Sequence, residues 1–421
     1  MNAPLCKGEG MKLFNIVMIS ILSLFILEAR ANTDMPADID SGEESRNARQ
    51  NEYVKWRKGF NAYLLEEDDD LSRLLSLKNS LKLIRITGDE LSEADYNIIH
   101  TAKELTSALL QQDHLDKRIN YALVFLCSEQ AITESCVAGG VREKSIAHDA
   151  SNLLYYLKKL DRVVMSHDAE LIEPVLNKIA QTSYYSEYYG IGAKELKSAL
   201  LKYEKTFLTE EQIENEVYKS IRNSEFADFY PDDKVKVIFE SNKSAASANL
   251  AVFSFLLSRS TYRGFSGIVS LCESPQYLTS CQHMISVLQQ SKSNLGILVS
   301  YSLQAKLAKR NNDFESFKDI QLSKKKILKS LICFAEQNEL MPIFSHPFDV
   351  FFNNIEEQGE IKAFELADKA LNSQLLKDGY YSHASEAPDC NKIKALSNEE
   401  YIDIYGISDN LQMNLDQYYQ D

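Results

Sequence analysis

The cysteines are the residues whose types and spacing point most directly to chemistry. Cys127 and Cys136 enclose eight residues, and Cys272 and Cys281 repeat this spacing 145 positions further along the chain. A zinc site needs additional cysteines or histidines two to four residues away, and only His283, beside the second pair, meets that condition. No Cys-x-x-Cys motif of the redox type occurs. We therefore predict a structural disulfide within each pair, and no metal.

The spacing also constrains the backbone between the paired cysteines. In an unbroken helix, residues nine apart lie on opposite faces and about 13 Å apart along the axis, whereas a disulfide needs Cα atoms within about 7 Å. Each motif is therefore predicted to be a helix, a tight loop and the start of a second helix. Cys333 and Cys390 are left for each other by elimination, and spacing alone does not settle this third pairing.

Other metal and nucleophile patterns are weaker. The seven histidines include no pair at i, i+4 and no His-Glu-x-x-His motif, so no metal site and no cofactor are predicted. Gly264-Phe265-Ser266-Gly267 is similar to a nucleophile elbow, but Ile268 stands where the second glycine belongs. An elbow also follows a strand, whereas the surrounding pattern here is helical. We do not predict serine hydrolase chemistry.

Glu240-Ser241 is the carboxylate motif that suggests an enzyme. It resembles the Glu-Ser of exported lytic transglycosylases, which are built on a helical superhelix, and this resemblance implies that Glu240 acts as a general acid on cell-wall glycan. A partly buried carboxylic acid with a raised pKa suits that role. The residues after Ser241 lack the Gly-Leu-Met-Gln-type segment of that family. We therefore favour a charge on a helix surface and keep the glycan-cleaving enzyme as the alternative.

A dense aromatic cluster precedes Gly190 and comprises Tyr184, Tyr185, Tyr188 and Tyr189. Tyrosine offers a large contact area and loses little entropy when it is ordered, so the cluster is a candidate for stacking on sugar rings or anchoring a peptide. In the competing interpretation, two of these rings pack in a core between repeats and two face water.

The surrounding elements are predicted to be helices. The chain has only 15 glycines and 8 prolines in 421 residues, too few for the turns of a β-rich protein. Capping-box patterns at Thr209 and Ser397 are typical of helix starts. Apolar residues recur three and four positions apart, as in the stripes Ile98, Ala102, Leu105, Leu109 and Leu153, Leu157, Leu160, Val164. The predicted fold class is all-α.

The offset of 145 extends beyond the cysteines and indicates an internal duplication. Identical residues at this offset include the pairs Leu126 and Leu271, Ser135 and Ser280, Tyr156 and Tyr301, Asp168 and Asp313, and Glu170 and Glu315. A repeat of this length holds several helices, and stacked repeats bury a continuous core. We predict antiparallel helix pairs in two duplicated halves, stapled by local disulfides.

One stretch in each half resembles the helix pair of the tetratricopeptide family. The first stretch spans 152–181 and the second 295–325, and each has an apolar helix, a polar turn with Asp168 or Asp313, and a second amphipathic helix. The resemblance covers about 30 residues per copy and lacks most of the family's glycine and small alanine positions. It implies an α-solenoid that binds partner proteins or peptides on a concave face.

The N-terminal segment has the three parts of a secretory signal. Lys12 precedes the apolar run 13–27, which is followed by a small-x-small site at 29–31. The run is short for a membrane span, which needs about 20 apolar residues. We expect cleavage before Asn32 and no stable membrane anchor afterwards, with an uncleaved anchor or a core helix as the alternatives. Met1 and Met11 both stay open as start sites.

Composition and pattern divide the chain into five predicted segments. They are a signal peptide at 1–31, a disordered acidic lead-in at 32–46, repeat halves at 47–200 and 201–345, and a C-terminal helical cap at 346–421. Loss of residues 1–31, with three basic and two acidic side chains, moves the net charge from −15 to −16. Such an acidic chain has no electrostatic reason to bind nucleic acid.

These observations predict an exported protein-binding or peptide-binding scaffold of a bacterial envelope, without catalysis. The periplasm is favoured over the extracellular space because disulfide-stapled soluble proteins suit it. The expected partner is an envelope protein or peptide whose identity the sequence does not give, and the oligomeric state stays open.

Overall fold

A computed structural model gives the arrangement of the helices. It describes residues 43–87, 91–112, 114–188, 190–203, 228, 230–238, 240–241, 248, 265–338, 345–383 and 389–406. These residues form helices joined by turns and contain no strand, which confirms the predicted all-α class. The predicted signal peptide, most of the acidic lead-in, Thr209 and Tyr189 lie outside the described residues. No described helix has the length and apolar character needed to cross a membrane.

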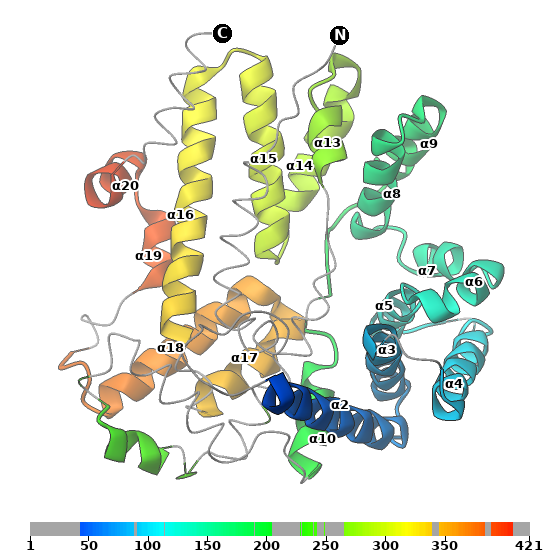
Figure 1. The fold of residues 1–421 in the computed structure, drawn as a ribbon. Helices are drawn as coiled ribbons and strands as arrows, with labels where there is room; N and C mark the ends of the chain where they lie inside the picture. The colour runs from blue at the N-terminus through cyan, green and yellow to red at the C-terminus, as the bar shows by residue number, and fades with distance from the viewer. Residues whose placement is uncertain are drawn as a thin grey trace.

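The helices of the first group pack against one another, and Figure 1 shows them in blue and cyan. Helix α4 begins with a capping box, in which the Ser92 hydroxyl accepts the Asp95 N–H and the Asp95 carboxylate accepts the Ser92 N–H. The break between α6 and α7 falls at Gly140, whose φ of 65° favours glycine. The set comprises α2 (Glu43–Leu65), α3 (Asp70–Thr87), α4 (Glu93–Leu109), α5 (Lys117–Leu126), α6 (Gln130–Ala138) and α7 (Val141–His148).

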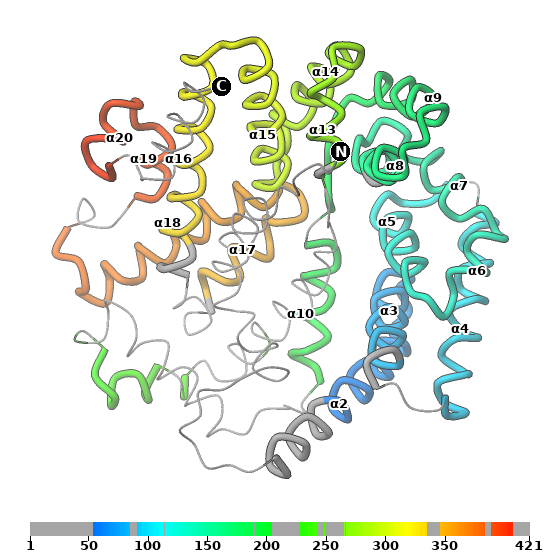
Figure 2. The backbone as a smooth tube through the Cα atoms, turned by 45° about the horizontal axis from the view of Figure 1, so that its top comes forward, coloured from blue at the N-terminus to red at the C-terminus, as the bar shows by residue number. Residues whose placement is uncertain are grey.

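The next group continues along a curved path, which Figure 2 shows from a second direction. Packed pairs in this group are α8 with α9, α8 with α13, α14 with α15, and α15 with α16. Its members are α8 (Leu154–Met165), α9 (Ala169–Ile179), α13 (Ser266–Leu271), the 3₁₀ turn η1 (Pro275–Tyr277), α14 (Leu278–Gln289), α15 (Asn294–Arg310) and α16 (Phe314–Asn338). Helix α10 (Ala193–Lys202) lies apart from them and packs on α17.

The C-terminal helices turn back along this path. Helices α17 (Ser345–Gln358) and α18 (Glu360–Lys377) form the most extensive helix pair in the described residues and lie below α15 and α16 in Figure 1. The short helices α19 (Cys390–Ala395) and α20 (Asn398–Tyr405) pack along α16. The capping box predicted at Ser397 is present, because its hydroxyl accepts the Glu400 N–H and the Glu400 carboxylate accepts the Ser397 N–H.

Three hydrophobic cores hold these helices together. Core 1 joins α2–α7 and α10 with α17 and α18, with Phe60, Leu123 and Phe351 buried in it. Core 2 joins α8, α9, α13, α14 and α15, and core 3 joins α15 and α16 with α19 and α20. Core 1 therefore contains residues from both predicted halves and from the predicted C-terminal cap. Helices that are far apart in the chain, such as α2 and α17, therefore belong to the same core.

All three predicted cysteine pairs are at disulfide distance. The Cα atoms are 5.8 Å apart for Cys127 and Cys136 and 5.7 Å apart for Cys272 and Cys281. The first cysteine of each pair caps a helix, α5 or α13, and the second lies in the next helix, α6 or α14. The predicted helix–loop–helix conformation of both motifs is therefore confirmed. Cys333 of α16 and Cys390 of α19 are paired as well, with Cα atoms 5.6 Å apart.

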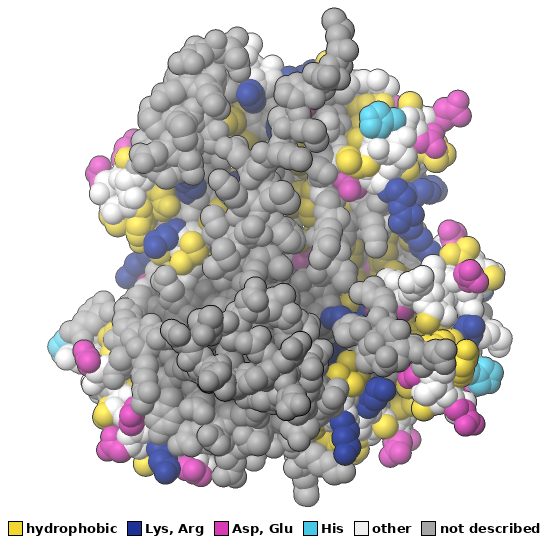
Figure 3. All heavy atoms as spheres, viewed as in Figure 1, with side chains coloured by type: hydrophobic (Ala, Val, Ile, Leu, Met, Phe, Trp, Pro, Cys, Tyr) yellow, Lys and Arg dark blue, Asp and Glu magenta, His cyan; other side chains and the backbone are white. Residues whose placement is uncertain are grey.

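Two lysines of the run 324–326 in α16 form hydrogen bonds to neighbouring elements. Lys324 donates a hydrogen bond to the Ser302 hydroxyl of α15 at 3.0 Å, and burial lowers the pKa of Lys324. Lys326 donates to the Leu396 carbonyl at 2.9 Å and so ties α16 to the turn between α19 and α20. On the face in Figure 3, acidic and basic side chains are interspersed over the described residues.

Candidate functional site

The predicted tyrosine cluster lies in the segment between α9 and α10, which runs from core 2 to core 1. The Tyr185 ring is buried in core 2, and Tyr188 packs against core 1. Ile191 is buried in core 1, so the chain changes core within a few residues. The segment 182–192 is therefore a link between the two largest cores, and we call it the linking segment.

The backbone of the linking segment is fixed by the turn before α8. The Leu153 N–H donates to the Tyr184 carbonyl at 2.8 Å. The side chain of Asn152, which is fully buried, donates to the Ser186 carbonyl at 3.0 Å and accepts the Ser186 N–H at 3.1 Å. The Asn152 side chain thus satisfies both backbone polar groups of Ser186, which lies outside any helix.

Two of the tyrosine hydroxyls converge on one buried carboxylate, that of Asp149. The Tyr188 hydroxyl donates to Oδ2 of Asp149 at 2.7 Å, and the Tyr184 hydroxyl donates to Oδ1. The Lys117 ammonium is 3.5 Å from Oδ1 and also donates to the Tyr184 hydroxyl at 3.2 Å. Asn152 donates to Oδ2 at 3.3 Å. Charge-assisted hydrogen bonds of this kind are about twice as strong as neutral ones, so the cluster holds the linking segment firmly.

The electrostatics of this cluster keep the hydroxyls protonated. Burial is the largest cause that raises the pKa of Tyr188, and its hydrogen bonds to Tyr184 and to Asp149 add to this effect. Burial and the bond to Asp149 also raise the pKa of Tyr184. The hydrogen bond to Tyr184 raises the pKa of Lys117. At neutral pH these groups are therefore hydrogen-bond donors, and none of them is a ready nucleophile or base.

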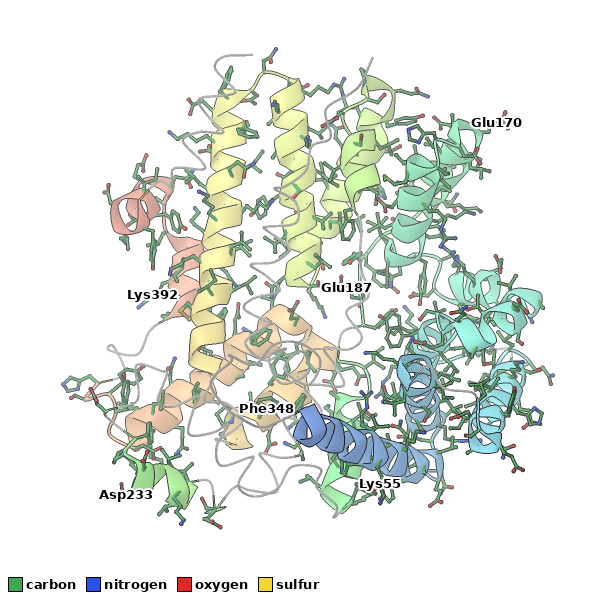
Figure 4. All side chains as sticks on the ribbon, in the orientation of Figure 1. Lys55, Glu170, Glu187, Asp233, Phe348 and Lys392 are labelled. Atoms are coloured by element: carbon green, nitrogen blue, oxygen red, sulfur yellow. A yellow bond between two sulfur atoms is a disulfide. The ribbon has the colours of Figure 1, made fainter. Side chains whose placement is uncertain are left out.

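The third tyrosine, Tyr185, donates a hydrogen bond to a second carboxylate, that of Glu187. The Tyr185 hydroxyl donates to Oε1 of Glu187 at 2.6 Å, and the Ser293 hydroxyl donates to Oε2 at 2.9 Å. Burial raises the pKa of Glu187. Figure 4 shows Glu187 beside the N-terminal end of α15. The nearby Glu360 accepts the Asn294 N–H at 3.0 Å, and burial raises its pKa to about 7, with the charge of Glu187 as a further cause.

The sequence did not indicate Asp149, the carboxylate on which Tyr184 and Tyr188 depend, or the contact of Ser293 with Glu187. Asp149 is 35 and 39 residues from its tyrosine partners, and Ser293 is 106 residues from Glu187. No local spacing rule connects such residues. The described tyrosines Tyr184, Tyr185 and Tyr188 act first as packing and hydrogen-bonding groups between helices, and any binding role is additional to this contact.

Glu240 is exposed, and both Glu240 and Ser241 have a helical conformation. The neighbouring Ser241 hydroxyl donates to the carbonyl of Ile238 at 2.9 Å, a local helical contact. A glutamate that acts as general acid on a glycan lies beside the bond to be cleaved, in a site that encloses the substrate, whereas the Glu240 side chain is exposed. This position matches the favoured interpretation of a helix-surface charge.

The elbow-like residues adopt a helical conformation from Ser266 onward, in α13. The Gly267 N–H donates to Oδ1 of Asp161 at 2.8 Å, so a side chain of α8 caps the N-terminus of α13. A Cβ on Gly267 would lie 2.9 Å from the Asp161 carbonyl, which explains the glycine by close helix packing. Gly264 lies outside the described residues.

Each cysteine loop is also held by a lysine from another helix. Lys78 of α3 is buried and donates to Glu129 at 2.5 Å, to the Phe125 carbonyl at 2.9 Å and to the Ser128 hydroxyl at 2.7 Å. In the second motif, Lys306 of α15 donates to Glu273 at 2.5 Å, and both of these side chains are about half exposed. Disulfide and lysine together fix each loop against a neighbouring helix.

Metal chemistry has no site in the part of the chain that the structure describes. Within it, no three histidine, cysteine, aspartate or glutamate side chains are grouped so that they could hold an ion. His100 pairs with Glu104 on the exposed face of α4 at 3.2 Å, and His283 contacts the Thr182 carbonyl at 3.1 Å.

Comparisons with models of protein families, with curated proteins and with solved structures each find no match to this chain.

Proposed function

We propose that this chain is an exported α-helical repeat protein of a bacterial envelope that binds a protein or peptide partner and does not catalyse a reaction. In this proposal the chain contains a duplicated unit, and the two copies stack as a short α-solenoid. The observation that carries the proposal is the recurrence of the same local geometry at an offset of 145 residues.

The first recurrence is at the cysteine loops. The Cys127 N–H donates to the Leu123 carbonyl, and the Cys272 N–H donates to the Ile268 carbonyl, which is 145 positions after Leu123. Three further backbone bonds, each from an N–H to the carbonyl three residues earlier, also match. In the first loop the donors are residues 128, 129 and 132, and in the second loop they are residues 273, 274 and 277, each 145 positions later. Two unrelated loops have no reason to share a whole series of bonds, so this match supports duplication.

The second recurrence is at the helix pairs that resemble the tetratricopeptide family. Helix α8 ends at residue 165 and α15 at 310, while α9 begins at 169 and α16 at 314, so both boundaries keep the offset. In each turn one non-glycine residue has a left-handed φ, 60° at His167 and 55° at Asn312. The N–H of the following residue, Asp168 or Asp313, donates five residues back, to Val163 or to Ala308. This αL closure is a known way to end a helix.

The contact between the two proposed copies is consistent with an array that ends after the second one. Gly267 of the second copy packs against Asp161 and Met165 on α8 of the first copy. At the offset of 145, the corresponding residues of α15 are Lys306 and Arg310. The face that receives the next unit is thus more strongly charged in the second copy, as expected for a terminal repeat.

The site chemistry supports a scaffold more than an enzyme. The carboxylates of Asp149 and Glu187 are engaged by tyrosine, lysine and serine donors that connect helices. Three cysteine pairs at disulfide distance suit an oxidising compartment and so support export.

Site-specific photo-crosslinking in cells tests the proposal. A photoreactive amino acid is placed at exposed apolar positions on different helices, namely Tyr96, Val137, Met165 and Leu171. We expect the mature protein to start at Asn32 and to crosslink to one envelope partner from neighbouring positions only. A chain that keeps its leader in the cytoplasm, or that crosslinks from no position, would contradict the proposal.

A further inference from the structure

Two carboxyl groups from distant parts of the chain meet at the first residues of α15. Glu187 of the linking segment accepts the Ser293 hydroxyl at 2.9 Å. Glu360, the first residue of α18, accepts the N–H of the adjacent Asn294 at 3.0 Å. Because consecutive residues bind the two carboxyl groups, the groups are close enough for the charge of one to act on the other.

This meeting point joins core 1 and core 2. The Tyr185 ring of core 2 lies on Gly296 of α15, where an added Cβ would come within 3.0 Å of it. On the other side, Gly190 lies against Ile355 of core 1, with room for no side chain. The Ile361 N–H donates to the Lys292 carbonyl at 3.3 Å. The linking segment, the start of α15 and the turn between α17 and α18 thus form one joint.

Among the described residues, one lysine acts on Glu360, and the groups that contact Glu187 are uncharged. The Lys292 ammonium donates to the Glu357 carbonyl at 3.1 Å, on the outside of the turn. The positive charge that acts on Glu360 is that of Lys394 in α19, which is itself shared with Glu365 of α18. On the side of the linking segment, the groups nearest Glu187 are neutral hydroxyls, those of Tyr185 and Ser293.

We propose that the Glu187–Glu360 joint is a pH-sensitive latch between core 1 and core 2, closed while the carboxyl pair holds a proton and loosened once both groups are ionised. This inference rests only on the joint and is independent of export and of partner binding.

The direction of the pH effect follows from proton binding. Burial raises the pKa of both Glu187 and Glu360, the latter to about 7, above the ordinary value of about 4.3 for an exposed glutamate. The closed joint therefore holds more protons than the open joint at intermediate pH. The stabilisation is complete below about pH 4 and is lost progressively as the pH rises through about 7.

Hydrogen exchange of the linking segment tests the latch in the full-length oxidised protein. Protection of residues 182–192 is measured at about pH 6 and about pH 8.5, after correction for intrinsic exchange with an unfolded reference peptide. We expect protection to fall about tenfold or more, since each pH unit above the pKa changes the ionisation equilibrium tenfold. Equal protection at both pH values in the wild-type chain would overturn the proposal without any variant.

Two isosteric variants and a control identify the groups responsible. We expect Glu360→Gln and, separately, Glu187→Gln to keep the segment protected at both pH values, because one carboxyl group can no longer ionise. Glu357→Gln changes a side chain that is 74% exposed on the same turn and should keep the wild-type pH response. The latch is refuted if both Glu360→Gln and Glu187→Gln respond to pH as the wild type does.

Discussion

Asp149 is the residue that binds two tyrosines of the linking segment. Its carboxylate accepts hydrogen bonds from Tyr184 and Tyr188 and faces Lys117 at 3.5 Å. Tyr188 also has a left-handed φ of 48°, a conformation that costs a non-glycine residue roughly 1–2 kcal/mol. The hydrogen bond to Asp149 offsets part of that cost.

Replacement of Tyr188 by phenylalanine removes this bond and keeps the ring. We expect the free energy of unfolding to fall by about 1.5–3 kcal/mol, the range for a hydrogen bond to a charged group. Chemical denaturation by urea measures the change, with Tyr96→Phe as the control because Tyr96 is 61% exposed. The control should change stability by no more than about 0.5 kcal/mol. Equal effects of the two substitutions would show that the Asp149 cluster contributes nothing specific.

The two loop lysines give a matched pair in which burial is the main difference. Lys78→Met leaves Glu129 buried without its cation, and we expect a loss of about 3–5 kcal/mol in the free energy of unfolding. Lys306→Met breaks an exposed pair with Glu273 and should cost about 1 kcal/mol or less. Urea denaturation of both variants measures the difference, and a Lys306 effect as large as that of Lys78 would contradict it.

At the scale of elements, the linking segment needs glycine where it meets α17. Gly190 has a φ of 90°, and a Cβ there would lie 2.6 Å from a carbon of Ile355. Gly379 has a similar φ of 79° but faces open space. Gly190→Ala should therefore destabilise the chain by about 1–3 kcal/mol more than Gly379→Ala, the cost of overpacking. Thermal unfolding of both variants measures the cost of the clash between the added Cβ and Ile355. Equal melting temperatures of the two variants would show that no such clash occurs.

The three disulfides should differ in their rates of reduction, because the attacking thiolate needs access to a sulfur atom. Cys272 and Cys281 are both fully buried, whereas Cys127 and Cys333 are partly exposed. We expect mild reductant in native buffer to open the Cys272–Cys281 bond last. Timed alkylation followed by peptide mass spectrometry gives the order, and early loss of the Cys272–Cys281 bond would contradict the burial described here.

Helix type and the cysteine loops were predictable from the sequence because their causes are local. The nine-residue spacing of Cys127 and Cys136 forces a turn, and the capping box at Ser397 defines a helix start. The partner of Tyr184 and Tyr188 was not predictable, because Asp149 reaches them only through the tertiary fold, and the same holds for the contact of Ser293 with Glu187. The same limit applies to core 1, which α17 and α18 share with α2 and α3 although about 250 residues separate the two helix pairs in the chain.

At the scale of the whole molecule, core 2 joins α8 and α9 with α13, α14 and α15, and the joint at the start of α15 links it to core 1. The proposed scaffold needs the two cores to keep a fixed relation, which the Asp149 cluster and the Glu187–Glu360 joint provide. The proposed latch makes that relation depend on pH, so a partner that contacts both cores should bind more weakly above neutral pH.

The most direct test of the central proposal is peptide mapping of the protein recovered from its native cells, without reductant and with free thiols blocked at lysis. We expect a mature N-terminus at Asn32 and three linked pairs, Cys127 with Cys136, Cys272 with Cys281, and Cys333 with Cys390. A chain that retains residues 1–31 and in which none of these six cysteines is linked would contradict an exported, disulfide-stapled helical repeat.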